Sequence, residues 1–290
     1  MKPTSYIFLA LSLVLLFCGW FTCSVAESMA DAKGIQLFEQ SINESGDSVY
    51  IYNLTDESLS KLSLTFASVD INIIGSSDNS YVELINFDPY DYSTSRSGGS
   101  VNVDGTISGL ASFIDSSGGG FRFKGLRYFF AKKPQSSIKR VNVYISDVSE
   151  LKSLSLSLKK GSVTFKNIGN SVDYNVNVSN GDVVFENVIS DTVINVGINN
   201  GDLKVKKTEC STLNVNITKG NVYVDASNYL PEYLSYDVKS TNGSIAYNLR
   251  AIEEESLMIS TPVDIQKCLI KITGTDSNVQ LIDASASSQQ

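Results

Sequence analysis

Apolar and polar residues alternate in short runs over the second half of the chain, and the same pattern returns about every 20 residues. Five segments align on a glycine: KKGSVTF (159–165), SNGDVVF (179–185), NNGDLKV (199–205), TKGNVYV (218–224) and TNGSIAY (241–247). The aligned glycines are Gly161, Gly181, Gly201, Gly220 and Gly243, so successive copies are 20, 20, 19 and 23 residues apart. A period of this size is typical of a repeat architecture in which each unit buries its apolar face against its neighbours.

Within each copy, apolar or aromatic residues stand seven and five positions before the glycine and two and four positions after it. This period of two predicts a β-strand on each side of the glycine, with one face buried. Glycine at the junction indicates a tight turn with a positive φ. Two arrangements bury the same positions. One is a hairpin, in which Val178 faces Val183 and Val176 faces Phe185, and the other is the corner of a stacked solenoid.

The first half of the chain carries a weaker form of the same pattern. Strands are expected over residues 62–66, 69–73, 81–84, 101–103 and 141–145. Residues 27–47 read as a spacer that could hold one short helix, and residues 273–281 read as a last, degenerate repeat. We therefore expect an all-β domain of stacked β-strand repeats, a β-solenoid or toast-rack-like fold, over residues 48–283, with a flexible tail at 284–290.

The composition excludes several kinds of chemistry. The 290 residues include no histidine, so the chain has no imidazole base and no Ser-His or Cys-His nucleophilic site. Its 23 Lys and Arg against 31 Asp and Glu give a formal net charge of −8, which argues against nucleic acid as a partner. The hydrophobic content of 42% is ample for a packed core.

The first 26 residues differ from the rest. An uncharged, Leu-rich run follows Lys2, and Ser24-Val25-Ala26 places small residues where a signal peptidase cleaves. A cleaved signal peptide is the favoured interpretation. The two alternatives are an uncleaved membrane anchor and lipid attachment at Cys18 or Cys23, and we expect the chain to be attached to a membrane only in these two cases. Each alternative places the remaining chain outside the cytoplasm.

The strings VNVYISDVSELKSLSLSLKKGSVTF (141–165), SNGDVVFENV (179–188) and SVDINIIG (68–75) resemble the bacterial putative-adhesin family. These are extracytoplasmic β-strand-repeat domains of unknown function whose repeats read N-G-[DS]-Φ-x-Φ, with Φ apolar. The resemblance covers about residues 60–283. It implies a stacked-strand fold at the cell envelope and supplies no catalytic residues and no cofactor. Lys160-Gly161 and Lys219-Gly220 replace the usual Asn-Gly, which leaves the turn type at these two copies open.

Polar residues at the repeats suggest two kinds of ligand. Asp182, Asp202 and Asn221 follow the glycines and carry oxygen atoms of the kind that bind Ca²⁺. The alternative, which we favour, is that Asp and Asn serve the turns themselves. A row of asparagines six positions before the glycine could bind glycan hydroxyls or could form a ladder of hydrogen bonds with itself. That row contains Asn175, Asn195 and Asn214.

One basic and aromatic stretch stands out in this acidic chain. Its cations include Lys124, Arg127, Lys132 and Lys133, followed by Lys139 and Arg140. They are either solvated charges on a hairpin or a contact patch for an acidic polymer or lipid headgroups.

Two cysteines, Cys210 and Cys268, lie beyond the N-terminal segment. They could form a disulfide, worth about 4 kcal/mol on the chain-entropy model. They could equally remain buried free thiols.

No nucleophile motif, phosphate loop or assignable pair of carboxylates is present in the sequence. Our first hypothesis is a non-enzymatic envelope or secreted protein that presents a rigid repeat surface to a glycan, a matrix or an envelope protein. The alternatives are a polysaccharide lyase or hydrolase that uses acidic residues, and an accessory domain that senses the state of the envelope. An enzyme should gather several carboxylates with an Arg or Lys in one cleft.

Overall fold

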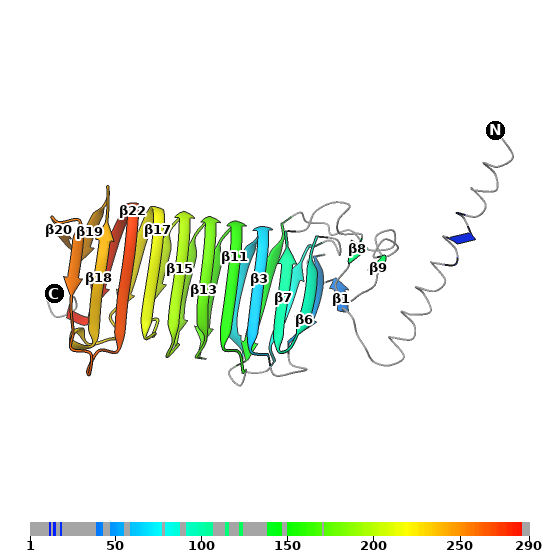
Figure 1. Cartoon of the computed structure of the whole chain (residues 1–290), viewed down its shortest axis with the longest axis horizontal. Helices are drawn as coiled ribbons and strands as arrows, with labels where there is room; N and C mark the ends of the chain where they lie inside the picture. The colour runs from blue at the N-terminus through cyan, green and yellow to red at the C-terminus, as the bar shows by residue number, and fades with distance from the viewer. Residues whose placement is uncertain are drawn as a thin grey trace.

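The structure is a computed structural model that describes residues 12, 14, 15, 18, 39–42, 47–54, 59–76, 79–87, 91–106, 114–115, 122–123, 138–146, 150–169 and 171–285. Its strands lie side by side in one long stack, perpendicular to the long axis of the molecule, as Figure 1 shows. The predicted all-β fold of stacked repeats is confirmed, because each central strand pairs in parallel with the strands of the neighbouring repeats.

Each central repeat contributes one strand to each of two sheets. In order along the stack, the first sheet contains β6 (Ser93–Ser97), β7 (Ser100–Gly105), β3 (Lys61–Ser68), β11 (Ser153–Lys160), β13 (Asp173–Asn180), β15 (Val193–Asn200), β17 (Thr212–Ala226), β22 (Cys268–Asp283), β18 (Leu234–Ser240) and β21 (Ser256–Ile259). The second sheet contains β1 (Glu39–Ile42), β2 (Ser48–Asn53), β5 (Tyr81–Ile85), β10 (Arg140–Ser146), β4 (Asp70–Ser76), β12 (Val163–Ile168), β14 (Val183–Val188), β16 (Leu203–Lys206), the later parts of β17 and β22, β19 (Ser244–Tyr247) and β20 (Arg250–Ile252). Both sheets are joined because β17 and β22 continue through the corner without a break. A separate pair consists of β8 (Ile114–Asp115) and β9 (Arg122–Phe123), and the 3-10 turn η2 (Pro231–Tyr233) precedes β18.

The strand pairing corrects one of the two arrangements expected from the pattern. Val178 pairs with Leu158 and Ile198 in the first sheet, while Val183 pairs with Val163 and Leu203 in the second. The two arms of a repeat therefore pair with neighbouring repeats and not with each other. The hairpin was a wrong interpretation, and the solenoid corner is right, because both arrangements bury the same side chains and the pattern does not distinguish them.

The interior is built from the apolar positions of the alignment. All of them are buried except Tyr247, which is partly buried. Because neighbouring repeats are in register, equivalent side chains stack directly on one another. The rings of Phe165 and Phe185 lie parallel, with centroids 4.3 Å apart, and Tyr174 meets the ring of Phe165 edge-on at 5.3 Å. Full burial of each such side chain contributes about 1.5–3 kcal/mol, and it is available only when the repeats stack.

The glycine corners of neighbouring repeats also stack on one another. The φ angles of Gly161, Gly181, Gly201 and Gly220 lie between 129° and 145°, so the two Lys-Gly copies turn as the Asn-Gly copies do. A Cβ atom at Gly181 would overlap the carbonyl oxygen of Gly161, and each later corner in this group stacks in the same way. The prediction of a positive φ is wrong at the fifth copy. There, Asn242 (φ 57°) takes the left-handed conformation in place of Gly243, since Asn tolerates it better than most residues.

The two ends of the stack are closed by antiparallel strands. At one end β6 pairs with β7 and β5 with β10, and at the other β21 pairs with β18 and β20 with β19. The strand β1 pairs with β2. It lies inside residues 27–47, so part of the expected spacer is a strand and not a helix.

The order of strands in space departs from their order in the chain near the C-terminus. The strand β22, which contains the predicted degenerate repeat, does not end the stack. It lies between β17 and β18 and pairs in parallel with both, as Figure 1 shows. Consequently, among the described strands, β18 and β19 pair with the rest of the stack only through β22.

Candidate functional site

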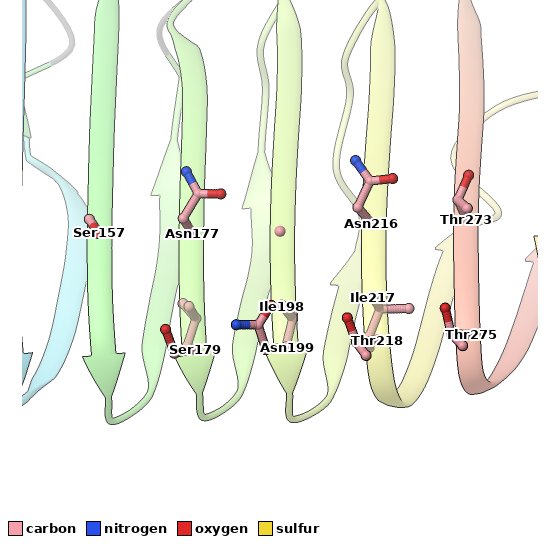
Figure 2. Close-up of a pocket in the computed structure, with 12 residues that line it drawn as sticks. Ser157, Asn177, Ser179, Ile198, Asn199, Asn216, Ile217, Thr218, Thr273 and Thr275 are labelled. Carbon is pink, nitrogen blue, oxygen red and sulfur yellow. The ribbon is translucent and has the colours of Figure 1, made fainter.

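The outer surface of the first sheet carries a shallow groove with a volume of about 370 Å³ over β11, β13, β15, β17 and β22 (Figure 2). One row of its lining runs across the strands through Ser157, Asn177, Gly197, Asn216 and Thr273. A second row, closer to the glycine corners, contains Ser179, Asn199, Thr218 and Thr275. Between the rows lie Val178, Ile198 and Ile217, whose side chains are buried. We call this feature the groove.

The groove exists because Gly197 interrupts a row of side chains. In the neighbouring row on the same sheet, Asn195 donates to Asn175 Oδ1 at 3.0 Å, and Asn214 donates to Asn195 Oδ1 at 2.9 Å. Such a ladder needs an amide on each successive strand. Gly197 removes one rung, so Asn177 and Asn216, on the strands to either side, cannot bond to each other across β15.

The amides of the groove are therefore left available. Within the described part of the chain, no side-chain hydrogen bond joins Asn177, Asn199 or Asn216 to the rest of the protein. Each of these amides offers two N–H donors and a carbonyl acceptor, and the five Ser and Thr hydroxyls of the lining add both functions. None of the described residues that line the groove is charged or aromatic. Its chemistry suits a neutral ligand that is rich in hydroxyl or amide groups.

The sequence prediction placed glycan binding one row away from the groove. Asn175, Asn195 and Asn214 are half-buried and satisfy one another in the ladder, which was the alternative interpretation of that row. The groove itself was not predicted. Its signal in the sequence is Gly197, a glycine inside an alternating strand, because such a position often marks a close approach by a ligand or another backbone.

The acidic residues after the corner glycines also form a ladder. Asp182 Oδ1 accepts the backbone N–H of Asp202 at 2.9 Å, and Asp202 Oδ1 accepts the backbone N–H and the side-chain amide of Asn221 at 2.7 and 3.0 Å. These carboxylates thus bind the next corner. Among the residues that the structure describes, no group of three or more Cys, Asp, Glu or His side chains is arranged to hold a metal ion.

The predicted contact patch lies mostly outside the described residues, since Lys124, Arg127, Lys132 and Lys133 all fall there. The end of that basic stretch is described, and it is engaged in ion pairs. Lys139 Nζ lies 2.5 Å from an Asp91 oxygen and 5.3 Å from the centre of the Phe87 ring. Arg140 lies 3.4 Å from Asp47. Whether the remaining cations form a contact patch stays a prediction.

The two cysteines beyond the N-terminal segment are neighbours. Cys210 and Cys268 are buried, with their Sγ atoms 3.8 Å apart and no covalent bond between them. The predicted signal peptide or anchor, residues 1–26, lies outside the described residues apart from Ser12, Val14, Leu15 and Cys18. Across the described residues, no helix reaches the length and hydropathy needed to cross a membrane.

The fold and the glycine corners define the class of protein, a two-sheet β-solenoid of stacked strand pairs. Residues 59–261 match the family described as Toastrack DUF4097, a domain of unknown function. The match spans well over half of the chain, and the chain therefore belongs to this family. The family resemblance inferred from the Asn-Gly repeats is confirmed.

The chain is also similar to several solved structures, all of them distant in sequence. One is a putative cell adhesion protein from Clostridium sporogenes, 12% identical, with 82% of this chain and 98% of that chain covered and a TM-score of 0.40. Another is a putative adhesin from Bacteroides fragilis, 10% identical, with 82% and 96% covered and a TM-score of 0.41. A third is a putative lipid binding protein from Parabacteroides distasonis, 10% identical, with 85% and 97% covered and a TM-score of 0.29. No protein of curated function matches the chain.

Proposed function

We propose that this protein is a non-enzymatic surface protein, located outside the cytoplasm, that binds a neutral polysaccharide along the groove of its first sheet. The observation that carries the proposal is the interrupted ladder at Gly197, which leaves the amides of Asn177 and Asn216 without partners beside a depression in the sheet. Free amides on a rigid, ridged surface can bond to sugar hydroxyls without reorganising the protein.

The direction of the groove favours an extended polymer. Neighbouring strands in a sheet are about 4.8 Å apart, so Asn177 and Asn216 are separated by about 10 Å across the strands. Thr273 continues the same row on the next strand. A chain of sugars lying across the strands would therefore meet a donor or acceptor at regular intervals.

The lining also bears on the enzyme hypothesis. A lyase or hydrolase would need carboxylates or a Lys or Arg at the bound sugar, and the lining residues that the structure describes supply none of these groups. Without an aromatic platform each site should bind weakly, and firm attachment would come from many copies acting together on one polymer. Such behaviour fits adhesion or assembly. The export signal expected in residues 1–26 supports a position at the envelope.

The test is a titration of the full chain with neutral and anionic oligosaccharides. Cello-oligosaccharide and malto-oligosaccharide hexamers serve as neutral probes and hyaluronan as the anionic probe, with binding followed by NMR. We expect neutral probes to shift the amide signals of β13, β15 and β17 and hyaluronan to leave them unchanged. Preferential binding of hyaluronan, or no binding of any neutral polymer in a wider screen, would contradict the proposal.

Two variants locate the binding site. The double variant Asn177→Ala/Asn216→Ala removes two hydrogen-bonding groups of about 1 kcal/mol each and should weaken binding by about tenfold or more. Gly197→Asn should fill the groove and complete the ladder, so that binding is lost while the fold is retained. Gln280→Ala removes an outward amide from β22 on the opposite sheet and is the matched control. Unchanged affinity in Gly197→Asn would show that the ligand binds elsewhere.

A further inference from the structure

Cys210 and Cys268 meet at one point in the fold from distant parts of the chain. Cys210 lies in the segment between β16 and β17, and Cys268 is the first residue of β22, 58 residues later. Their side chains are 5% and 2% exposed, and the sulfur atoms are 3.8 Å apart. A disulfide requires an S–S distance of about 2.05 Å, so the two sulfur atoms must approach each other further to form one.

The backbone on both sides of the pair is held in place. The Tyr229 hydroxyl accepts the backbone N–H of Cys210 at 2.9 Å and donates to the Cys210 carbonyl at 3.2 Å. On the other side, the N–H of Leu269 donates to the carbonyl of Ser211 at 3.0 Å, and Cys268 pairs with Leu234 of β18. The approach of the two thiols is therefore imposed by the backbone and does not depend on the sulfur atoms themselves.

The position of the pair matters because of the strand order. The strand β22 is last in the chain, yet it lies between β17 and β18. If β22 separated from β17, β18 and β19 would lose the one parallel pairing that joins them to the stack among the described strands. A bond between Cys210 and Cys268 would tie the first residue of β22 to the segment that leads into β17, and this is the junction on which the C-terminal repeats depend.

We propose that Cys210 and Cys268 form a disulfide when the chain folds in an oxidising compartment, and that this bond locks β22 between β17 and β18. Each thiol gives up its proton, and the pair gives up two electrons as the S–S bond forms. A disulfide oxidant, either a small-molecule disulfide or the disulfide of a thiol oxidoreductase, takes up the electrons and is released as two thiols. The proposal rests on the geometry and strand order and is independent of the glycan proposal.

The burial of the pair determines when the bond forms. The hydrogen bond with Cys268, followed by burial, raises the pKa of the Cys210 thiol, so the reactive thiolate is scarce once the repeats have closed. Oxidation therefore occurs during folding or through a local opening of β22. The folded, reduced protein should oxidise slowly, and the oxidised protein should resist reduction until it is unfolded.

The experiment uses the full chain, refolded in a buffer of reduced and oxidised glutathione, alkylated, and digested with trypsin without reduction. Cleavage after Lys207, Lys219, Lys267 and Lys271 gives the peptides 208–219 and 268–271, each with one cysteine. We expect mass spectrometry to find these two peptides linked, and to find them separate after reduction. Recovery of both peptides only in the alkylated form would overturn the proposal.

The effect of the disulfide on β22 is tested separately by hydrogen exchange and thermal unfolding of the oxidised and reduced protein. Oxidation should slow exchange in the first half of β22 and in β18 and should raise the unfolding temperature. The variant Cys210→Ala/Cys268→Ala should lose this redox response, whereas Cys18→Ala/Cys23→Ala, which changes the other two cysteines, should keep it. If the two peptides were linked but exchange in β22 and β18 were no slower, the proposal that the disulfide holds β22 in place would be refuted.

Discussion

The stacked glycine corners predict that adding one methyl group to Gly181 lowers the free energy of unfolding substantially. Its φ of 145° is a conformation that residues with a Cβ atom rarely adopt, and the added Cβ would overlap the carbonyl oxygen of Gly161. The first effect costs about 1–3 kcal/mol. The second can be relieved only if neighbouring repeats move apart, which strains the hydrogen bonds that Gly161 and Gly181 donate to Asn180 and Asn200 at 3.0 and 2.9 Å. Each such bond is worth about 1 kcal/mol.

Gly181→Ala should therefore lower the free energy of unfolding by about 3 kcal/mol. For a domain of this size that corresponds to a fall in unfolding temperature of about 6–12 °C, measured by circular dichroism. Other glycines of the same chain separate the two causes. Gly98 has a φ of 53° and open space around its Cβ position, so Gly98→Ala reports the cost of a left-handed φ without any overlap. Gly243 has no positive φ but lies against the Ser277 carbonyl, so Gly243→Ala reports the overlap alone.

Gly197→Ala is the control without either penalty. Its added Cβ would lie 2.7 Å from Asn177 Oδ1, the end of a flexible side chain that can rotate away. Because glycine within a strand costs about 0.5–1 kcal/mol relative to alanine, this variant should be as stable as the wild type or slightly more stable. If Gly181→Ala unfolded at the same temperature as Gly197→Ala, the tight stacking of the glycine corners would not be the reason for glycine in the repeat.

Three further predictions concern buried and half-buried polar groups. The Tyr174 hydroxyl is buried without a partner, so Tyr174→Phe should leave the free energy of unfolding unchanged or raise it by about 1 kcal/mol. Tyr247→Phe removes a hydrogen bond to Asp283 and should lower the free energy of unfolding, and equal losses for the two variants in urea unfolding would refute this. Asn195→Ala breaks two hydrogen bonds of the asparagine ladder and should lower the free energy of unfolding in urea by about 1–2 kcal/mol. Asn216→Ala should lower it by less than about 0.5 kcal/mol, and the reverse order of the two variants would contradict the ladder. Burial raises the pKa of Asp283, but hydrogen bonds from Ser285, Tyr247 and Asn248 outweigh it and lower the pKa overall. Since the folded pKa lies below the unfolded one, ionised Asp283 stabilises the protein above about pH 4, and this stabilisation is lost as the pH falls through the folded pKa. The difference in free energy of unfolding between wild type and Asp283→Asn, measured in urea, should therefore shrink on acidification, and a difference that grew would contradict the assignment.

Much of the fold follows from the sequence because it depends on local physics. Alternation in steps of two identifies the strands and their buried faces, and the apolar positions of the alignment, from Leu154 to Ile245, are buried in the structure. The recurring glycines mark the corners because only glycine is readily accommodated at their φ angles and close contacts. Even the substitution of Lys for Asn before Gly161 and Gly220 leaves the corner unchanged, since the glycine carries the constraint.

The candidate site was less accessible from the sequence. The asparagines at positions 175, 195 and 214 drew attention because they recur, yet recurrence is what allows them to satisfy one another. The free amides lie beside Gly197, where the row is broken. Identifying them requires the register between β13, β15 and β17, because only the register shows which side chains are neighbours on the surface.

The sequence by itself determined the strands, their inward faces and the repeat, since these depend on steric limits and on apolar residues two positions apart. The tertiary structure alone decided which strands pair, because a hairpin and a solenoid bury the same residues and differ only in their partners. It also decided that β22 lies between β17 and β18, and so brought Cys268 to within 3.8 Å of Cys210. Such pairings join residues far apart in the chain, and their free energy comes from contacts that no local pattern records.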